Sequence, residues 1–428
     1  MTVYPQSHFV SDKGVSVGGV LLQDLAAKYG TPLYVMDEFT IRQNCKRYTE
    51  PLLQSYPDSL VVYAGKANLN IPLINVIASE GLGLDVVSGG ELYTALKSNM
   101  DPTKIYFHGN NKSLEELRMA LTNEVVVVVD NMYEIQHIES LCNTGLKAKI
   151  LIRLKPEIEA HTHEYIKTGQ IDSKFGFDVR DLDELMGVLS KIKGLTYLGI
   201  HSHIGSQIFD TKPFLESVTI MMNHIERIYR KTGTETLQLN LGGGIGIQYI
   251  DSDKPPLISE YINAVAEKVK KECEKRQLTP PKIIFEPGRS IVGNAGITLY
   301  TVGAIKNIQD IKCYLFVDGG MADNPRPILY QAEYTYGLAR YPFGKENHTY
   351  SIAGKFCESG DILANNIVLP EVEVGDVLVV YGTGAYNYAM ASNYNRSLKP
   401  AMVSVMDQQS KIWVKRETWN DLIRNDLQ

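Results

Sequence analysis

Cysteine is scarce in this sequence, and its distribution excludes two classes of cross-linked protein. The chain has five cysteines in 428 residues, and no two of them have CxxC spacing. Scattered thiols of this kind argue against a disulfide framework and against a zinc site. A reducing cytoplasm is therefore the expected location.

The sequence also lacks long apolar runs and clusters of positive charge. No run approaches the roughly 20 apolar residues needed to span a bilayer, and the opening MTVYPQSHFVSDKG has neither the basic nor the apolar region of a secretion signal. The net charge is −6, and no basic stretch is interleaved with aromatic residues. We therefore expect no membrane and no nucleic-acid partner, and a small molecule as the ligand.

What the sequence does have is an alternation of short apolar runs with stretches of helical period. The eight runs are LVVYAG (60–65), LGLDVVS (82–88), KIYFHG (104–109), VVVVVD (125–130), KILIRL (149–154), YLGIHSHIG (197–205), LQLNLGGG (237–244) and KIIFEPG (282–288). Between them, segments such as 92–100, 114–121 and 182–192 have apolar residues at intervals of three and four. This pattern predicts a closed (β/α)8 barrel of parallel strands, with an open doubly wound sheet as the competing architecture.

The pattern changes after about residue 286, where short strands and turns replace the helical periods. LYTVGAIKNI, KCYLFVDGG, TYSIAG and VEVGDVLVVYG alternate apolar and polar residues and are separated by turn residues, which is typical of an antiparallel β domain. The N-terminal residues before TPLYVMDE also lack a helix-plus-strand unit, so we expect them to join this domain. The predicted division is 39–285 for the barrel, and 1–38 with 286–428 for the β domain.

Polar, titratable and glycine residues gather at one end of the predicted barrel strands. In chain order they are Lys66, Asp85, Ser88, His108, Arg153, His201, His203, Gly242, Gly243, Gly244, Glu286 and Arg289. The carboxyl ends of barrel strands form the rim on which barrel enzymes assemble their sites. We therefore expect these residues to share one mouth, although a lysine that simply extends into water is the alternative for Lys66.

Three motifs on this rim each allow two interpretations. LGGGIG (241–246) is either a flexible turn or a phosphate cradle made of backbone N–H groups. HSHIGS (201–206) contains either core histidines or the HxH spacing of a metal site, but no third ligand follows at a matching spacing, so no metal is predicted. EPGR (286–289) is either a surface turn with a Glu–Arg pair or part of the site.

A lysine, a phosphate cradle, an imidazole and a carboxylate on one rim are the parts of a pyridoxal 5'-phosphate site. The lysine amine forms a Schiff base with the cofactor, a carboxylate keeps the pyridine nitrogen protonated, and an imidazole can stack on the ring. A primary amine must be partly neutral to attack a carbonyl, so we expect Lys66 to be desolvated at its strand tip. The predicted cofactor is pyridoxal 5'-phosphate.

Ten segments, in order over nearly the whole chain, resemble the diaminopimelate decarboxylases, which belong with the ornithine and arginine decarboxylases to the alanine-racemase-like barrel class of pyridoxal enzymes. The segments are YAGKAN (63–68), GLGLDVVSGGEL (81–92), IYFHGNNKS (105–113), HTHEYIKTG with KFGF (161–177), HSHIGSQ (201–207), LNLGGGIG (239–246), FEPGRSIV (285–292), DGGMADNPRPILY (318–330), CESGD (357–361) and GAYNYAMASNYN (384–395). The resemblance implies a cofactor-binding TIM barrel followed by an antiparallel β-sandwich or barrel. It also implies decarboxylation of meso-2,6-diaminopimelate to L-lysine and carbon dioxide, the last step of lysine biosynthesis.

The resemblance also implies roles for individual residues. Lys66 is similar to the Schiff-base lysine, His203 to the histidine on the cofactor ring, and Glu286 to the partner of the pyridine nitrogen. The implied cofactor-binding residues are Lys66, His203, Ser206, Gly242, Gly243, Gly244, Glu286, Pro287, Gly288, Arg289 and Tyr386. The implied substrate-binding residues are Arg289, Arg326, Tyr330, Glu358 and Tyr386.

The final proton would come from Cys357 or Lys66, and these two residues form the implied catalytic pair. Cys357 and Glu358 would enter the site from the neighbouring subunit, so the resemblance implies a homodimer with two shared active sites. Asp85, His108 and Asp361 either support the site or have plain structural roles. The family segment between DGGM and RP differs here, where ADNPRP places Pro325 and Pro327 around Arg326.

The chemistry of the implied substrate agrees with these roles. meso-Diaminopimelate carries an ammonium and a carboxylate at each end, and the planar fork of arginine suits its remote carboxylate. Ornithine has no such carboxylate and would leave two arginines unpaired. We expect this loss to favour meso-diaminopimelate over ornithine by a factor on the order of a thousand. The first alternative is another barrel decarboxylase, of the ornithine, arginine or carboxynorspermidine type. The second is a non-catalytic regulatory protein that binds the cofactor.

Overall fold

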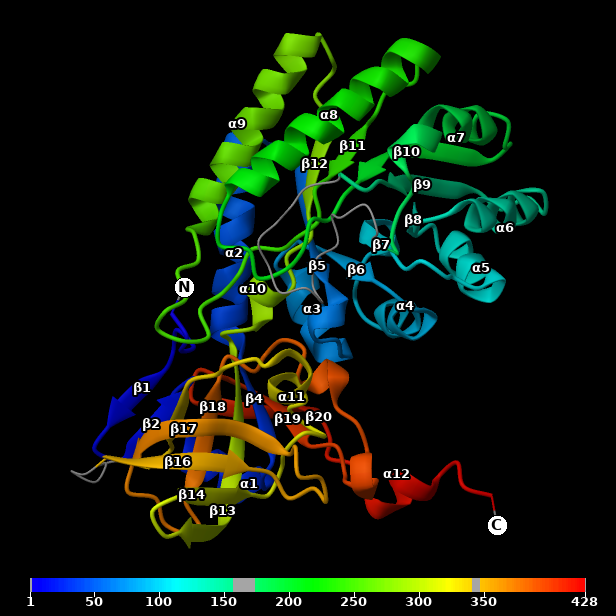
Figure 1. Ribbon diagram of the computed structural model, residues 1–428. Coiled ribbons are helices and arrows are strands. Elements are labelled where there is room, and N and C mark those ends of the chain that lie inside the picture. Colours follow the sequence, from blue (N-terminus) through cyan, green and yellow to red (C-terminus); the bar gives the residue numbers. More distant parts are fainter. Residues whose placement is uncertain (1, 157–173, 341–346, 428) are drawn as a thin grey trace. The chain divides into compact units, whose positions relative to one another are not determined.

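The computed structural model describes residues 2–156, 174–340 and 347–427, which form two compact units (Figure 1). The barrel unit comprises Asn44–Gly246 and Pro255–Gly288, and the β unit comprises Met1–Gln43, Ile247–Lys254 and Arg289–Gln428. The segment HTHEYIKTG (161–169), which contributes to the resemblance above, lies outside the described residues.

The barrel unit contains, among its described residues, a closed barrel of eight parallel strands. The strands are β5 (Ser59–Ala64), β6 (Gly83–Val86), β7 (Ile105–Phe107), β8 (Val126–Val129), β9 (Ala148–Arg153), β10 (Leu195–His201), β11 (Gln238–Asn240) and β12 (Lys282–Phe285). They are short and largely buried, and all four valines of β8 are buried. Strands that are apolar on both faces pair in parallel when helices cover the outside of the barrel. The predicted (β/α)8 barrel is confirmed, and the open-sheet alternative is wrong.

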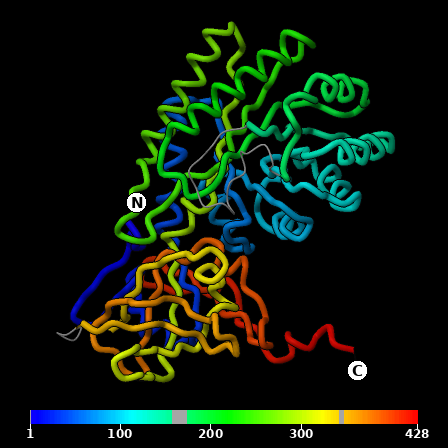
Figure 2. Tube along the Cα trace, in the orientation of Figure 1, coloured from blue at the N-terminus to red at the C-terminus, as the bar shows by residue number. Residues whose placement is uncertain are grey.

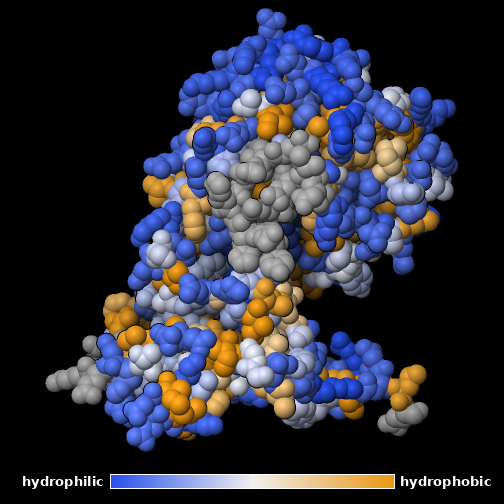
Figure 3. Space-filling view, in the orientation of Figure 1, coloured by the Kyte–Doolittle hydropathy of each residue, from blue (hydrophilic) through white to orange (hydrophobic). Residues whose placement is uncertain are grey.

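Helices precede and connect these strands. They are α2 (Glu38–Ser55), α3 (Ile71–Ser79), α4 (Gly89–Leu96), α5 (Leu114–Thr122), α6 (Met132–Cys142), α7 (Leu182–Leu189), α8 (Lys212–Thr232) and α9 (Ile258–Arg276). Helix α5 shows how the sequence specifies them: Ser113 and Glu116 form a reciprocal capping box at its start, and Leu117 and Leu121 on its inner face are buried. The surface over the barrel helices is mostly hydrophilic in Figure 3. In the chain as described, no helix has the length and apolar character needed to cross a bilayer.

The β unit is built around a mixed sheet of nine strands within the described ranges. Its strands are β4 (Leu33–Asp37), β13 (Gly296–Ile308), β14 (Lys312–Val317), β15 (Tyr336–Leu338), β16 (Asn347–Ala353), β17 (Ile362–Pro370), β18 (Val377–Tyr381), β19 (Ala401–Met406) and β20 (Gln409–Val414). Most pairs are antiparallel, as predicted, but β14 pairs with β16 and β4 pairs with β19 in parallel. The unit also contains a small sheet of β1 (Phe9–Ser11), β2 (Gly14–Val17) and β3 (Val20–Leu21), and the helices α1 (Leu22–Tyr29), α10 (Arg289–Val292), α11 (Arg326–Tyr330) and α12 (Trp419–Ile423).

The N-terminal residues form part of this β unit. Strand β4 lies between β13 and β19, and Figure 2 shows the blue N-terminal trace among the yellow to red C-terminal segments. Val35 of β4, Leu299 of β13 and Val403 of β19 are fully buried in one hydrophobic cluster. The centre of the sheet is therefore assembled from three distant segments of the chain.

One connection of the barrel belongs to the β unit. Residues 247–254 follow the glycine loop beyond β11 and lead towards α9. Tyr249 packs with Tyr300 and Tyr334 in a hydrophobic cluster of the β unit, and the Thr335 hydroxyl donates to the Tyr249 carbonyl at 2.8 Å. This connection places a buried tyrosine among residues that lie far from it in the sequence.

Candidate active site

Lys66 lies directly beyond β5, in the short 3-10 helix η1 (Gly65–Ala67). Gly65 and Ala67 are buried, but the lysine side chain is exposed rather than desolvated. The positive charge of Lys66 also affects His203 on the same rim. Burial mainly, and then the positive charges of Lys66 and Arg153, hold the pKa of His203 well below its ordinary value. His203 is therefore a neutral imidazole at neutral pH.

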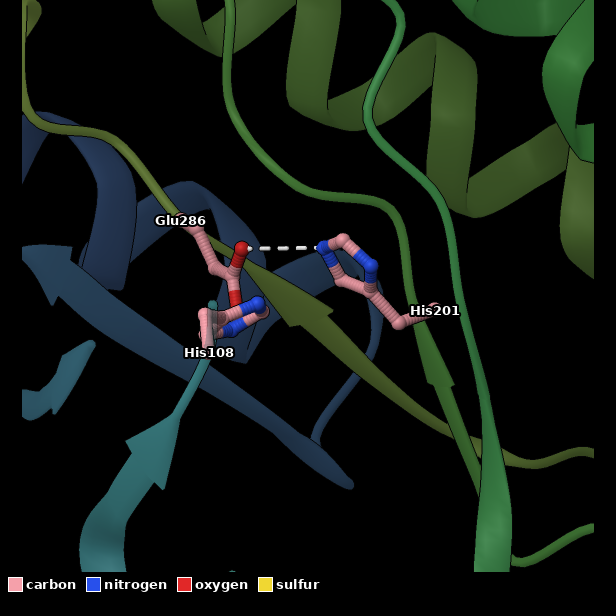
Figure 4. A group of neighbouring side chains, drawn as sticks. All are labelled: His108, His201 and Glu286. Carbon is pink, nitrogen blue, oxygen red and sulfur yellow. Dashed lines mark hydrogen bonds and ion pairs between the residues drawn. The ribbon is translucent and has the colours of Figure 1, made fainter. Parts of the chain in front are cut away.

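Glu286 lies just beyond β12, at the centre of a buried network that includes His108 and His201 (Figure 4). Its Oε1 accepts from His108 Nε2 at 2.8 Å and from Asn240 Nδ2 at 2.6 Å. Its Oε2 is 3.2 Å from His201 Nε2. All four side chains are at most 6% exposed. Because a carboxylate only accepts hydrogen bonds, three donors from three other strand ends converge on one anion.

The electrostatics of this network keep the Glu286 carboxyl ionised. Burial alone would raise its pKa, but the charges and hydrogen bonds of His108 and His201 hold the pKa well below its ordinary value. Burial lowers the pKa of His201 to about 4, although Glu286 opposes this shift. Asp85 Oδ1 lies 3.8 Å from His108 Nε2, and burial raises the pKa of Asp85 to about 6, with Glu286 adding to the rise and His108 opposing it. Two carboxyl groups with separated pKa values thus flank one imidazole.

The same side chains are also the residues that a metal ion would use. One ligand atom from each of His108, His201 and Glu286 lies within 4.8 Å of the others, and zinc accepts this set of donors. In the structure these atoms bond to one another, so the two imidazoles hold the Glu286 carboxylate. His203 is not part of this group in the described residues: its Nδ1 accepts the N–H of Gly243 at 3.4 Å. The HxH pair therefore does not form a joint ligand set.

The glycine loop beyond β11 leaves no room for side chains. A Cβ added to Gly243 would lie 2.1 Å from the carbonyl oxygen of Glu286, and one added to Gly244 would lie 2.6 Å from that of Gly205. Gly242 and Gly244 also have φ values of +64° and +129°, which side chains rarely allow. The loop therefore presents bare backbone on the rim, as a phosphate cradle requires.

The loop that carries Ser206 runs beside the glycine loop. The Ile208 N–H donates to the Gly244 carbonyl at 3.0 Å, and the Gly246 N–H donates to the Ile208 carbonyl at 3.0 Å. Pro287 and Gly288 adjoin the strand before Lys66, because the Pro287 carbonyl accepts the N–H of Ala64 at 3.0 Å. Backbone amides, a hydroxyl, a carboxylate and a lysine on one rim fit a phosphorylated aldehyde cofactor with a ring nitrogen.

A second group of predicted site residues lies in the β unit. Arg289 of α10 and Arg326 of α11 are buried, and both donate to the hydroxyl of Tyr249, at 2.6 and 3.2 Å. The Tyr386 ring faces both guanidinium groups, with its centroid 4.8 Å from Arg289 Cζ and 5.9 Å from Arg326 Cζ. The structure thus brings Arg289, Arg326 and Tyr386 together. Tyr330 ends α11 and is half-buried.

The unusual ADNPRP segment forms the start of a helix. Pro325 is the N-cap of α11, and Pro327 occupies its first turn, where a proline loses no helical hydrogen bond. Arg326, between them, is 8% exposed. The two prolines therefore fix the backbone that presents this arginine.

The CESGD segment forms an exposed turn in the β unit. Cys357 and Glu358 are both exposed, so Cys357 is not a buried structural cysteine. The N–H of Cys357 donates to Asn395 Oδ1 at 3.0 Å. Asp361, in contrast, is buried and accepts the N–H of Phe356 at 2.9 Å, so its contacts organise the turn.

Sequence reasoning missed two residues of these groups. Asn240 could have been found, because it is a polar residue near the end of the run LQLNL and comes just before the glycine loop. Tyr249 had no such signal, because its partners Arg289 and Arg326 come from later segments and its own segment has no clear period. Long-range contacts of this kind are visible only in the fold.

Residues 40–293 match a family described as pyridoxal-dependent decarboxylase, pyridoxal binding domain. Over 422 residues the chain is 44% identical to a diaminopimelate decarboxylase of Synechocystis, covering 96% of this chain and 90% of that protein. Over 417 residues it is 46% identical to a diaminopimelate decarboxylase of Bacillus subtilis, covering 96% of this chain and 95% of that protein.

The fold of the chain is also similar to that of a solved diaminopimelate decarboxylase structure. The crystal structure of a diaminopimelate decarboxylase from M. jannaschii in complex with L-lysine superposes with a TM-score of 0.93 at 34% identity. The match covers 100% of this chain and 99% of that chain.

Proposed function

This chain belongs to the pyridoxal-dependent decarboxylases, and on that premise we propose that it removes one carboxylate of meso-2,6-diaminopimelate and releases carbon dioxide and L-lysine. Its cofactor is pyridoxal 5'-phosphate. The observation that carries this conclusion is 46% identity, over nearly the full length of both chains, to a diaminopimelate decarboxylase. The enzyme is a carboxy-lyase that serves lysine biosynthesis.

The residues of the barrel unit are proposed to hold the cofactor. Lys66 would bind its aldehyde carbon, and the loops 242–244 and 286–288 with Ser206 would hold its phosphate. When bound, the cofactor supplies an electron sink for the electron pair that remains when the carboxylate leaves. Glu286 is ionised and buried, so it can accept the proton of a pyridinium nitrogen in a charge-assisted hydrogen bond. His203 is neutral, so it can lie against the ring without adding a second positive charge.

The residues of the β unit are proposed to bind the substrate. Arg289 and Arg326 would receive the carboxylate that the substrate keeps, because two guanidinium groups match its charge and its geometry. Glu358 would receive the remote ammonium, and Tyr330 and Tyr386 would line the same part of the site. The sulfur of Cys357 or the amine of Lys66 would return a proton to the carbon that has lost its carboxylate.

The assembly is proposed to be a homodimer with two shared sites. The exposed turn that carries Cys357 and Glu358 supports this proposal, since both side chains lie at the surface of the chain. We also propose a cytoplasmic enzyme without nucleic-acid or membrane partners, in keeping with a net charge of −6. The division into 39–285 for the cofactor domain, and 1–38 with 286–428 for the β domain, belongs to the same proposal.

Carbon dioxide release from three substrates tests the proposed reaction. We expect purified enzyme with added cofactor to decarboxylate meso-diaminopimelate far faster than ornithine or arginine. Faster turnover of ornithine would overturn the roles of Arg289 and Arg326.

The visible absorbance of the bound cofactor tests the proposed lysine. Lys66→Ala should remove the absorbance band of the linkage, because no other amine is proposed to form it. Lys97→Ala, at an exposed lysine after α4, is the matched control and should keep the band. A band retained in Lys66→Ala would place the linkage elsewhere.

A further inference from the structure

The hydroxyl of Tyr249 lies between two buried arginines that belong to different helices. Arg289 Nη1 donates to it at 2.6 Å, and Arg326 Nη1 donates to it at 3.2 Å. The exposed fractions are 6% for Tyr249, 7% for Arg289 and 8% for Arg326. A single neutral oxygen thus joins two like charges away from solvent.

The surroundings of Arg326 are phenols and aromatic rings. Its Nη1 also donates to the Tyr334 hydroxyl at 2.8 Å. Its Cζ lies 5.3 Å from the Tyr249 ring centroid and 5.8 Å from the Tyr334 ring centroid. Burial would lower the pKa of Arg326, but the contacts with Tyr334 and Tyr249 hold that pKa above its ordinary value. Arg326 is therefore charged, and these aromatic neighbours hold it without neutralising it.

The chemistry of a phenol explains what this arrangement achieves. A phenol oxygen has two lone pairs, so it can accept one N–H from each guanidinium group. A carboxylate in the same place would form ion pairs with the arginines and compete with any anionic ligand. A neutral acceptor fixes the spacing of the two guanidinium groups without itself neutralising their positive charge.

We propose that Tyr249 is a positioning residue for substrate recognition, whose hydroxyl holds Arg289 and Arg326 as a preformed receptor for the carboxylate that the substrate keeps. This inference rests on the proposed function, in which these two arginines bind that carboxylate. A preformed receptor loses less conformational entropy on binding than two independent side chains do.

The ionisation of Tyr249 gives the proposal a pH signature. Burial would raise the pKa of the Tyr249 phenol, but the charges and hydrogen bonds of Arg289 and Arg326 hold it below its ordinary value. Among the described residues, the charged groups that bond to this hydroxyl are Arg289 and Arg326, and the Tyr334 ring packs edge-on against the Tyr249 ring with centroids 5.4 Å apart. A tyrosinate would pair with the arginines, so carboxylate binding should weaken at alkaline pH as Tyr249 ionises.

Tyr249→Phe tests the proposal, because it keeps the ring and removes only the hydroxyl. Inhibition of the holoenzyme is measured with L-lysine, which has the retained carboxylate, and with 1,5-diaminopentane, which has none. We expect the inhibition constant for L-lysine and the KM for meso-diaminopimelate to rise about tenfold, the equivalent of one lost hydrogen bond. The inhibition constant for 1,5-diaminopentane should change less than twofold, kcat should fall less than KM rises, and the alkaline weakening should disappear.

Tyr336→Phe is the matched control, since the Tyr336 hydroxyl donates to the Leu363 carbonyl at 3.0 Å. It should leave both inhibition constants unchanged. An unchanged L-lysine constant in Tyr249→Phe, or an equal rise for both inhibitors, would overturn the proposal.

Tyr334→Phe keeps the proposal testable if Tyr249→Phe does not fold, as thermal unfolding would reveal. It removes one partner of Arg326, and we expect a smaller rise that is again confined to L-lysine; no rise would overturn the proposal. Failure of the proposed function is separable, because wild-type enzyme would then release no carbon dioxide from meso-diaminopimelate.

Discussion

Replacing His108 by leucine should remove one of the three hydrogen bonds that the Glu286 carboxylate accepts. The imidazole Nε2 lies 2.8 Å from Glu286 Oε1, and both side chains are about 5% exposed. Leucine keeps apolar volume at this position but cannot donate a hydrogen bond. The Glu286 carboxylate would retain its contacts with Asn240 and His201.

The size of the effect follows from the burial of this pair. A hydrogen bond to a charged group contributes about 1.5–3 kcal/mol, and one pKa unit corresponds to about 1.4 kcal/mol. We therefore expect the pKa of Glu286 to rise by about one to two units in His108→Leu. A carboxyl whose pKa is depressed in the folded state stabilises that state above its unfolded pKa of about 4.3 and loses this contribution as the pH falls. The stability difference between wild type and variant should be largest at neutral pH.

Two measurements and one control variant test this reasoning. The carboxyl resonance of Glu286 is titrated by NMR in the apoprotein, and the free energy of unfolding is measured in urea at pH 7 and pH 4. His108→Gln keeps an N–H donor and should recover much of the loss. An unchanged Glu286 titration in His108→Leu would refute the proposed role of the imidazole, and equal losses in the leucine and glutamine variants would refute donation as its cause.

Three further outcomes follow from other parts of the structure. Gly243→Ala should weaken cofactor binding by at least an order of magnitude in an absorbance titration, because its Cβ would lie 2.1 Å from the carbonyl oxygen of Glu286; unchanged binding would contradict the cradle. Asp323 is buried, and burial raises its pKa to about 7. The free energy of unfolding should therefore fall by up to roughly 4 kcal/mol as the pH rises from about 4 to 7. In Asp323→Asn, the free energy of unfolding measured in urea should depend less on pH over this range. An equally steep pH dependence in the variant would count against the raised pKa of Asp323. Mixed Glu358→Ala and Lys66→Ala subunits should regain activity through hybrid dimers, and the absence of recovery would argue against shared sites.

The strands were predictable from the sequence because buried parallel strands are short apolar runs. VVVVVD (125–130) contains β8 (Val126–Val129), and KIIFEPG (282–288) contains β12 (Lys282–Phe285). The apolar runs often extend past the strands at their carboxyl ends, where glycines and polar residues leave the ladder. Helix starts were less predictable: α4 begins at Gly89, because Ser88 caps it by accepting the N–H of Glu91, ahead of the expected segment 92–100.

The chemistry of the rim was predictable to the level of residue types. Glu286, His201 and His108 do meet in one network, as their positions at the carboxyl ends of barrel strands suggested. For Lys66 the sequence left a desolvated position and an extension into water both open, since it does not specify how open the mouth is, and the structure shows the side chain exposed. EPGR contributes residues to both units, because the chain passes from the barrel unit to the β unit between Gly288 and Arg289.

Strand β4 has a consequence for how the protein is made. It emerges early from the ribosome, yet it pairs with residues 296–299 of β13 and 401–405 of β19. At about 5–20 residues per second, this apolar strand waits tens of seconds for its first neighbour. During that interval the nascent chain exposes an unpaired apolar segment near its N-terminus. We expect ribosome-associated chaperones to shield this segment until translation is nearly finished.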